Sequence, residues 1–125
     1  MKKEKKVEIE RSVDRKTLFD SFLKLLGTNY SIEQRLSDGE REVLVEFMAL
    51  PDKFKYNRFS TLGRKVVRES LKKSNTHLNR YIYFLEKKKF IYKDNDGIFC
   101  LATVLDKILN VDKLELNFKF LVKDE

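Results

Sequence analysis

The chain has 125 residues, 42% of them hydrophobic, and its 27 basic and 20 acidic residues give a net charge of +7. That length suffices for one modest core, while 10 Phe and 5 Tyr argue against a disordered chain and 4 Gly with 1 Pro argue against a loop-rich sandwich. We expect one compact, mostly helical domain with terminal additions.

The expected compartment follows from the single cysteine and from the absence of a recognisable signal peptide or membrane span in the sequence. Cys100 is the only cysteine, which excludes an intramolecular disulfide and a cysteine-based zinc site and fits a reducing intracellular setting. The N-terminal lysines lead into no apolar segment of a signal peptide, and no run approaches the ~20 apolar residues of a membrane span. The sequence predicts a cytoplasmic protein, or for a viral protein one of the host cytoplasm or virion, without a membrane partner.

The positive charge is concentrated in one third of the chain. Between Lys53 and Lys93 there are thirteen basic and two acidic residues, a net charge of +11, so the remaining residues carry a net charge of −4. Such asymmetry is typical of a surface that meets phosphates, but a lysine-rich solvated face has the same composition. Composition leaves both interpretations open.

The first elements in chain order are a short strand and a helix. Residues 5–13 alternate Val7 and Ile9 with Glu8 and Glu10, a period of two that predicts a strand. Asp14 then caps a helix that runs until Gly27. Its apolar positions at helical spacing are Leu18, Phe19, Phe22, Leu23, Leu25 and Leu26.

Two further helices start at clear cap residues. Ser37 and Glu40 fit a capping box, in which each side chain accepts the free backbone N–H of the other residue, and Pro51 ends the helix that follows. A short extended or loop segment leads to Ser60, where a third helix begins. The apolar residues expected to point inward are Val43, Leu44, Phe47 and Met48 in the second helix and Leu62, Val66, Val67 and Leu71 in the third.

A fourth helix and a hairpin follow at once. Ser74 is the expected N-cap of a helix that reaches residue 89. The apolar runs FIYK and IFCLA, joined by DNDG, predict a β-hairpin because Asn, Asp and Gly tolerate positive φ. The buried side of the helix is predicted to hold Leu78, Tyr81, Ile82 and Leu85.

A short helix over residues 103–110 and a second terminal strand over 113–122 complete the chain. In that strand apolar residues alternate with Glu115, Asn117 and Lys119, so one face is apolar and needs a partner. The nearest candidate is the strand at 5–13, in the same chain or in a second subunit. We therefore divide the chain into an N-terminal arm or strand (1–13), a central domain (14–109) and a C-terminal strand or tail (110–125).

The order helix, short segment, helix, turn, helix, hairpin over residues 36–103 resembles a winged helix-turn-helix. The stretch FSTLGRKVVRESLKKSNTHLNRYIYFLEKKKFIYKDNDGIF is similar to winged-helix modules of MarR-type regulators and of phage and plasmid replication proteins. In those modules a Ser or Thr opens the recognition helix, L-x-x-x-I-x-x-L packs it, and K-x-F-I leads into the wing. The resemblance implies an α+β fold, mostly helical, with a C-terminal hairpin wing, an extra N-terminal helix and short terminal strands.

The chain departs from the pattern of these modules at two places. Lys89 stands where many members carry a glycine in a left-handed turn, at a cost of ~1 kcal/mol. Asp94 and Asp96 make the tip of the wing acidic, whereas a wing that touches DNA more often carries Arg or Lys. We therefore expect the wing to contribute little to phosphate binding.

The resemblance implies that residues 74–89 lie in the major groove of duplex DNA. Asparagine can pair with adenine and arginine with guanine, and basic side chains hold phosphates. The expected base contacts are Asn75, Thr76, Asn79 and Arg80. The expected phosphate contacts are Arg64, Lys65, Arg68, Lys72, Lys73, Tyr83 and Lys87.

Two functions stay open from the sequence. One is a duplex DNA-binding protein, either a small transcriptional regulator or a replication accessory factor, for which a homodimer is favoured because paired half-sites need a two-fold protein. The other is a non-enzymatic structural or adaptor protein, such as a subunit of a phage particle or other assembly, that uses a winged helix for protein contacts. We expect no enzyme, metal or cofactor, because His77 is the single histidine and Cys100 lies in an apolar strand.

Overall fold

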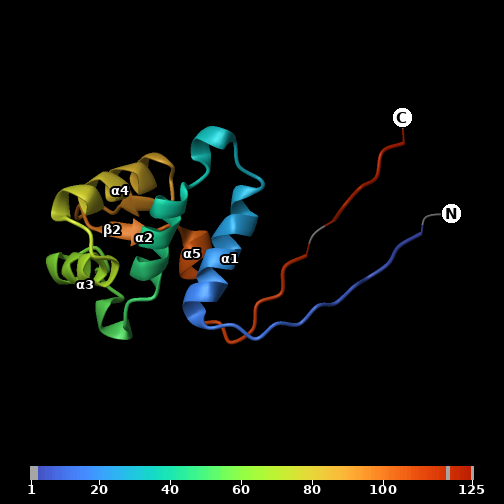
Figure 1. Ribbon diagram of the computed structural model, residues 1–125, viewed down its shortest axis with the longest axis horizontal. Helices are drawn as coiled ribbons and strands as arrows, with labels where there is room; N and C mark the ends of the chain where they lie inside the picture. The colour runs from blue at the N-terminus through green and yellow to red at the C-terminus, as the bar shows by residue number, and fades with distance from the viewer. Residues whose placement is uncertain (1–2, 118, 125) are drawn as a thin grey trace.

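The computed structural model describes residues 3–117 and 119–124, which form an α+β fold (Figure 1). This part of the chain contains five α-helices and one two-stranded antiparallel hairpin, so the predicted α+β class is confirmed. In chain order the elements are α1 (Arg15–Gly27), η1 (Ile32–Gln34), α2 (Asp38–Met48), η2 (Asp52–Phe54), α3 (Thr61–Leu71), α4 (Asn75–Lys87), β1 (Ile91–Lys93), β2 (Phe99–Leu101) and α5 (Thr103–Asp106). The order from α2 to β2 is compatible with a winged helix. Within the described residues, no helix combines the length and the apolar character needed to cross a membrane.

Helix α2 is the centre of the body, with α1 on one side and α3 and α4 on the other (Figure 1). Its inward side chains Val43, Leu44 and Phe47 have no solvent exposure. The Phe47 ring stacks on Phe59 with the ring centroids 4.2 Å apart. The apolar stripe predicted for α2 is therefore confirmed, and it forms the middle of the core.

The predicted N-caps of four helices are confirmed. Each cap is a local contact between residues three apart. The side chains of Asp14, Ser37, Ser60 and Ser74 accept the backbone N–H of Thr17, Glu40, Gly63 and His77 respectively. The capping box at the start of α2 is complete, since the Glu40 side chain accepts the N–H of Ser37 at 2.8 Å. Local hydrogen bonds therefore fix where these helices begin.

The predicted hairpin is confirmed, with Ile91 opposite Leu101 and Tyr92 opposite Cys100. Its turn is held by Asp94, whose Oδ1 accepts the backbone N–H of Asp96 at 2.8 Å and of Ile98 at 3.0 Å. Gly97 has a φ of 78°, in the left-handed region that glycine enters without strain. One of the two acidic residues at the tip therefore has a structural role in the turn.

Helix α3 is rotated relative to the prediction. Val67 is buried and Leu71 packs against the core, as expected, but Leu62 is 56% exposed and Val66 is also exposed, so their predicted inward positions are wrong. The inward position in the first turn is taken by Gly63, where a Cβ would overlap the backbone carbonyl of Arg58. This close backbone approach, which only glycine permits, sets the rotation of the helix.

The prediction of terminal strands at 5–13 and 113–122 is wrong for the single chain, because the described residues of both segments form no strand. Residues 3–13 and the described residues from 110 onward lie outside regular secondary structure; Val111 and Leu114 still pack against the core, and the outer parts of both segments extend away from the body (Figure 1). A strand needs a partner for its backbone hydrogen bonds, and the three-residue strands of the hairpin pair only with each other. Phe118, part of the second expected strand, lies outside the described residues.

Candidate nucleic-acid interface

The outer face of α4 carries all four side chains that the sequence predicts as base contacts. Asn75, Thr76, Asn79 and Arg80 are exposed, and so are Tyr83 and Lys87 farther along the helix. The opposite face is anchored by the buried side chains of Leu78, Ile82 and Leu85. The rotation predicted for α4 is therefore confirmed, and its polar face points to solvent.

Asn79 is held in place by Arg64 from the neighbouring helix. Arg64 Nη1 donates to Asn79 Oδ1 at 3.2 Å, while its Nε donates to the backbone carbonyl of Phe59 at 2.8 Å. The guanidinium also lies over the Phe99 ring, 6.0 Å from the centroid. Arg64 thus joins α3, α4 and the hairpin, and its Nε and Nη1 each donate within the protein.

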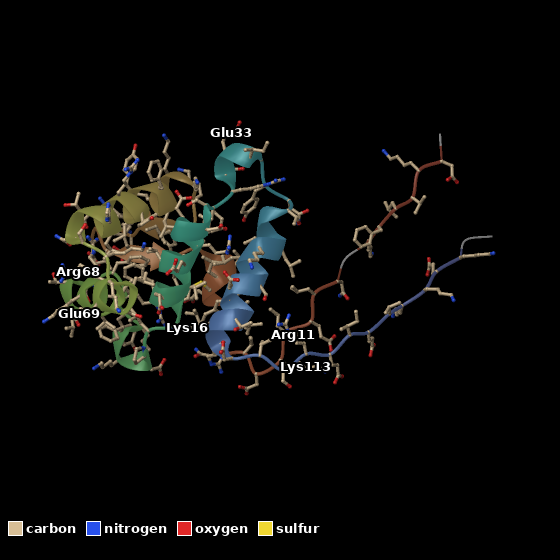
Figure 2. The ribbon with its side chains drawn as sticks, in the orientation of Figure 1. Arg11, Lys16, Glu33, Arg68, Glu69 and Lys113 are labelled. Carbon is tan, nitrogen blue, oxygen red and sulfur yellow. The ribbon has the colours of Figure 1, made fainter. Side chains whose placement is uncertain are left out.

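Helix α3 and the turn after it present most of the expected phosphate-binding residues. Lys65 and Lys72 are exposed, and Arg68 and Lys73 are half-buried. Lys73 Nζ lies 5.2 Å from the centroid of the Tyr81 ring, so its aliphatic part covers an aromatic surface while its charge stays near solvent. Figure 2 shows Arg68 at the edge of the body opposite the terminal arms.

Two lysines occupy left-handed turns that end helices. Lys72 ends α3 with a φ of 54°, and Lys89 follows α4 with a φ of 70°. In the second turn the N–H of Phe90 donates to the carbonyl of Leu85 at 3.0 Å and that of Lys89 to Glu86 at 3.0 Å, the paired bonds of a Schellman motif. The left-handed position expected at Lys89 is confirmed, and the second one, at Lys72, lies in the turn between α3 and α4.

Arg58, counted in the basic segment of the sequence, does not belong to the basic surface. Its side chain is buried, and its Nη1 donates to the carbonyl of Leu50 at 3.1 Å and more distantly to those of Phe47 and Met48, at the end of α2. Burial lowers the pKa of Arg58, although the nearby carboxylates of Asp106 and Asp52 work in the opposite direction. Arg58 therefore satisfies helix carbonyls, a role that no local sequence pattern indicates.

The far end of α4 is tied to the start of α2 by a buried ion pair. Lys88 Nζ contacts Glu40 Oε1 and donates to the backbone carbonyl of Arg35 at 2.8 Å. Glu40 is only 6% exposed, so this pair is shielded from solvent. At the middle of α4, Tyr81 lies against Gly39 in the first turn of α2, where a Cβ would come within 2.7 Å of the Tyr81 hydroxyl. These contacts fix the position of α4 on the core.

A pocket of about 230 Å³ lies between the segment that follows η2 (residues 55–59), the hairpin and α5. Tyr56 and Tyr92 line it, and their exposed fractions are 84% and 49%. Cys100 also lines it; burial, and then the neighbouring carboxylate of Asp94, raise the pKa of its thiol. The thiol is therefore a weak nucleophile at neutral pH.

Within the described residues, no group of three or more His, Cys, Asp or Glu side chains is arranged to hold a metal ion. Comparison with protein-family models, with curated proteins and with solved structures finds no match to the chain.

Proposed function

We propose that the chain is a winged helix-turn-helix protein that binds duplex DNA with α4 in the major groove, as a small transcriptional regulator or replication accessory factor. The observation that carries the proposal is the outer face of α4, where Asn75, Thr76, Asn79 and Arg80 are exposed together beside the basic helix α3. A helix presented between a second helix and a hairpin has the dimensions of a major-groove reading element.

Asn79 is suited to reading adenine because Arg64 already orients it. The carbonyl oxygen of an asparagine has two acceptor positions, so Oδ1 can accept from Arg64 and from the adenine amino group while the amide nitrogen donates to the base. Arg80, which is exposed, can reach guanine in the same groove. Sequence preference is thus expected to depend on Asn79 and Arg80 and, through Asn79, on Arg64.

Affinity would come from the basic residues around this face. Arg64 already donates to Phe59 and Asn79. The other candidates for phosphate contacts are Lys65, Arg68, Lys72, Lys73, Tyr83 and Lys87. Five of these six are cationic, so counterion release predicts that the logarithm of affinity falls with the logarithm of salt concentration with a slope of up to about −4.5. The Asp94 turn and the exposed Asp96 leave the hairpin tip acidic, so the hairpin contributes little to this slope.

The first experiment measures binding to labelled duplex DNA by fluorescence anisotropy between about 50 and 300 mM salt. Selection from a random duplex pool, repeated with Arg80→Ala, then measures sequence preference. We expect a steep salt dependence, and Arg80→Ala should relax the preference at one base pair by about 1–3 kcal/mol. Absence of binding at the lowest salt concentration would refute the proposal.

A matched pair of variants separates DNA contact from stability. Lys72→Gly and Lys89→Gly each relieve a left-handed lysine, so both should stabilise the fold, but only Lys72 lies in the turn between α3 and α4. Lys72→Gly should weaken DNA binding and reduce the salt slope by about 0.9, whereas Lys89→Gly should leave both unchanged. Equal binding by the two variants would argue against a phosphate contact at Lys72.

A structural or adaptor role is a second candidate, and the exposed apolar side chains of the terminal arms favour it. Val7, Ile9 and Phe120 are each at least 80% exposed. In this case the arms, and not α4, would be the working surface of an assembly subunit. Formation of a ring or larger oligomer, combined with absence of DNA binding at low salt, would support this role against the first.

A further inference from the structure

The two terminal arms begin at one point of the body. Arg15, the first residue of α1, donates from Nη1 to the carbonyls of Leu109 at 3.1 Å and Val111 at 2.8 Å, and its Nη2 lies 3.5 Å from Asp112 Oδ1. The N-terminal arm (residues 3–13) enters the body there and the C-terminal arm (residues 110–117 and 119–124) leaves it, so the arms run in opposite chain directions. Figure 2 shows Arg11 and Lys113 on the arms near this point.

Both arms have the side-chain pattern of a strand with one apolar face. Lys113 and Glu115, two residues apart, form an ion pair at 3.1 Å, which places them on the same side of an extended segment. The apolar residues at alternate positions in the outer parts of the arms are highly exposed. They include Val7 (80%), Ile9 (88%), Phe120 (89%) and Val122 (85%). By contrast, Val13 and Leu116 are 40% and 39% exposed, and Leu114 packs against the core.

The register that sets Asp112 opposite Arg15 makes the two arms complementary. Most apolar residues then face each other, and opposite charges are paired. The apolar pairs are Val13 with Leu114 and Val7 with Phe120, together with Ile9 and Phe118 from the sequence, and the charged pairs are Glu8 with Lys119, Glu4 with Lys123 and Lys3 with Asp124. Lys5 and Arg11 lie opposite the apolar residues Val122 and Leu116.

Other registers lose this complementarity. A shift by one residue sets apolar side chains of one arm against the charged face of the other. A shift by two in one direction puts Glu10 opposite Glu115 and Lys6 opposite Lys119. The same shift in the other direction puts Lys6 opposite Lys123. Like charges directly opposite destabilise a strand pair, so a single register is favoured.

We infer that the two arms of one chain pair as an antiparallel β-ribbon in this register, and that its apolar face closes on the same ribbon of a second copy of the chain. A two-stranded ribbon is marginal alone in water, so its apolar face needs a cover. An identical ribbon supplies a matching apolar strip, and Lys3, Lys5, Arg11 and Asp124 lie on the same face. The inference is independent of DNA binding.

The size of the ribbon predicts how tight the dimer is. Eleven residue pairs give a strip about 35 Å long and about 10 Å wide, which is small compared with the ~800 Å² that each partner buries in a standard interface. We therefore expect a weak, concentration-dependent dimer. Because the arms extend away from α3 and α4, the dimer leaves the outer face of α4 accessible (Figure 1).

Charge reversal across the ribbon tests the register. Glu8→Lys and Lys119→Glu each set like charges opposite one another, and the double variant restores an opposite-charge pair with its signs exchanged. Sedimentation equilibrium should show a dissociation constant raised roughly tenfold in each single variant and restored in the double. A wild-type chain that stays monomeric at all concentrations, or a double variant no better than the singles, would overturn the inference.

Disulfide trapping tests which segments pair. In a Cys100→Ser background, Val7→Cys with Phe120→Cys should form a cross-link within one chain under mild oxidation, because the register sets these residues opposite each other. Val7→Cys with Leu121→Cys is the matched control, since residue 121 lies on the other face, and it should cross-link far less. Equal cross-linking of both pairs, or cross-links only between chains, would contradict the ribbon.

Discussion

Replacing Arg58 by Met tests whether this arginine holds the core or serves the basic surface. Arg58 is 8% exposed, and its Nη1 donates to the carbonyl of Leu50 at 3.1 Å, with longer contacts of 3.4 and 3.5 Å to Phe47 and Met48. Methionine has a similar length but no donor. The carbonyls at the end of α2 would therefore remain buried without this partner.

The expected loss of stability combines two opposing effects. Loss of a hydrogen bond from a charged group costs about 1.5–3 kcal/mol, and the two longer contacts add little. Removing the charge recovers part of its desolvation cost, and the pKa of Arg58, lowered by burial, indicates that this cost is real. We expect a net loss of about 2 kcal/mol in the free energy of unfolding, which lowers Tm by roughly 6–10 °C in a chain of this size.

Urea unfolding followed by circular dichroism measures this loss. Arg80→Met is the matched control, because Arg80 is exposed on α4 and its replacement should change stability by less than about 0.5 kcal/mol. When DNA affinity is measured below the unfolding transition, Arg80→Met should bind more weakly than wild type, whereas Arg58→Met should bind about as tightly as wild type. If Arg58→Met is as stable as the control, Arg58 does not hold the end of α2.

Two further predictions concern stability. Lys89→Gly should raise the free energy of unfolding by about 1 kcal/mol, because glycine accepts the φ of 70° without strain; a loss of stability in urea unfolding would show that the Lys89 side chain makes a larger contribution. For Asp20, burial acts to raise the pKa, but hydrogen bonds from Arg41 and Lys24 outweigh it and hold the pKa below its usual value of 3.8. Its contribution to stability is therefore present above pH 3.8 and lost as the pH falls through the lower folded value. Asp20→Asn should flatten Tm against pH in the acid range, and an unchanged acid dependence would rule out this contribution.

Local interactions made much of the fold predictable from the sequence. The caps at Asp14, Ser37, Ser60 and Ser74 each depend on a residue three positions away, so their patterns were sufficient to locate the helices. The hairpin was equally predictable, since Asp94 and Gly97 satisfy the turn within a few residues. The exposed face of α4 followed from its apolar periodicity, and with it the position of all four expected base contacts.

The terminal arms show where a local pattern is insufficient. Their alternating residues predicted strands, yet a strand exists only when another segment supplies its hydrogen bonds, and the single chain offers them no free sheet edge nearby. The alternation remains a property of the sequence. In the proposed dimer each arm supplies the hydrogen bonds of the other, and the second chain covers the apolar face of the ribbon.

The sequence by itself determined the helix starts, the hairpin and the polar face of α4, because these depend on contacts within a few residues. Only the tertiary structure decided that Gly63 faces the core in place of Leu62, that Arg58 is buried, and that Arg64 orients Asn79. The physical reason is that these roles come from contacts with other elements. A charge count treats Arg58, Arg64 and Arg80 alike, whereas packing assigns the first to the core, the second to a link between helices and the third to the surface.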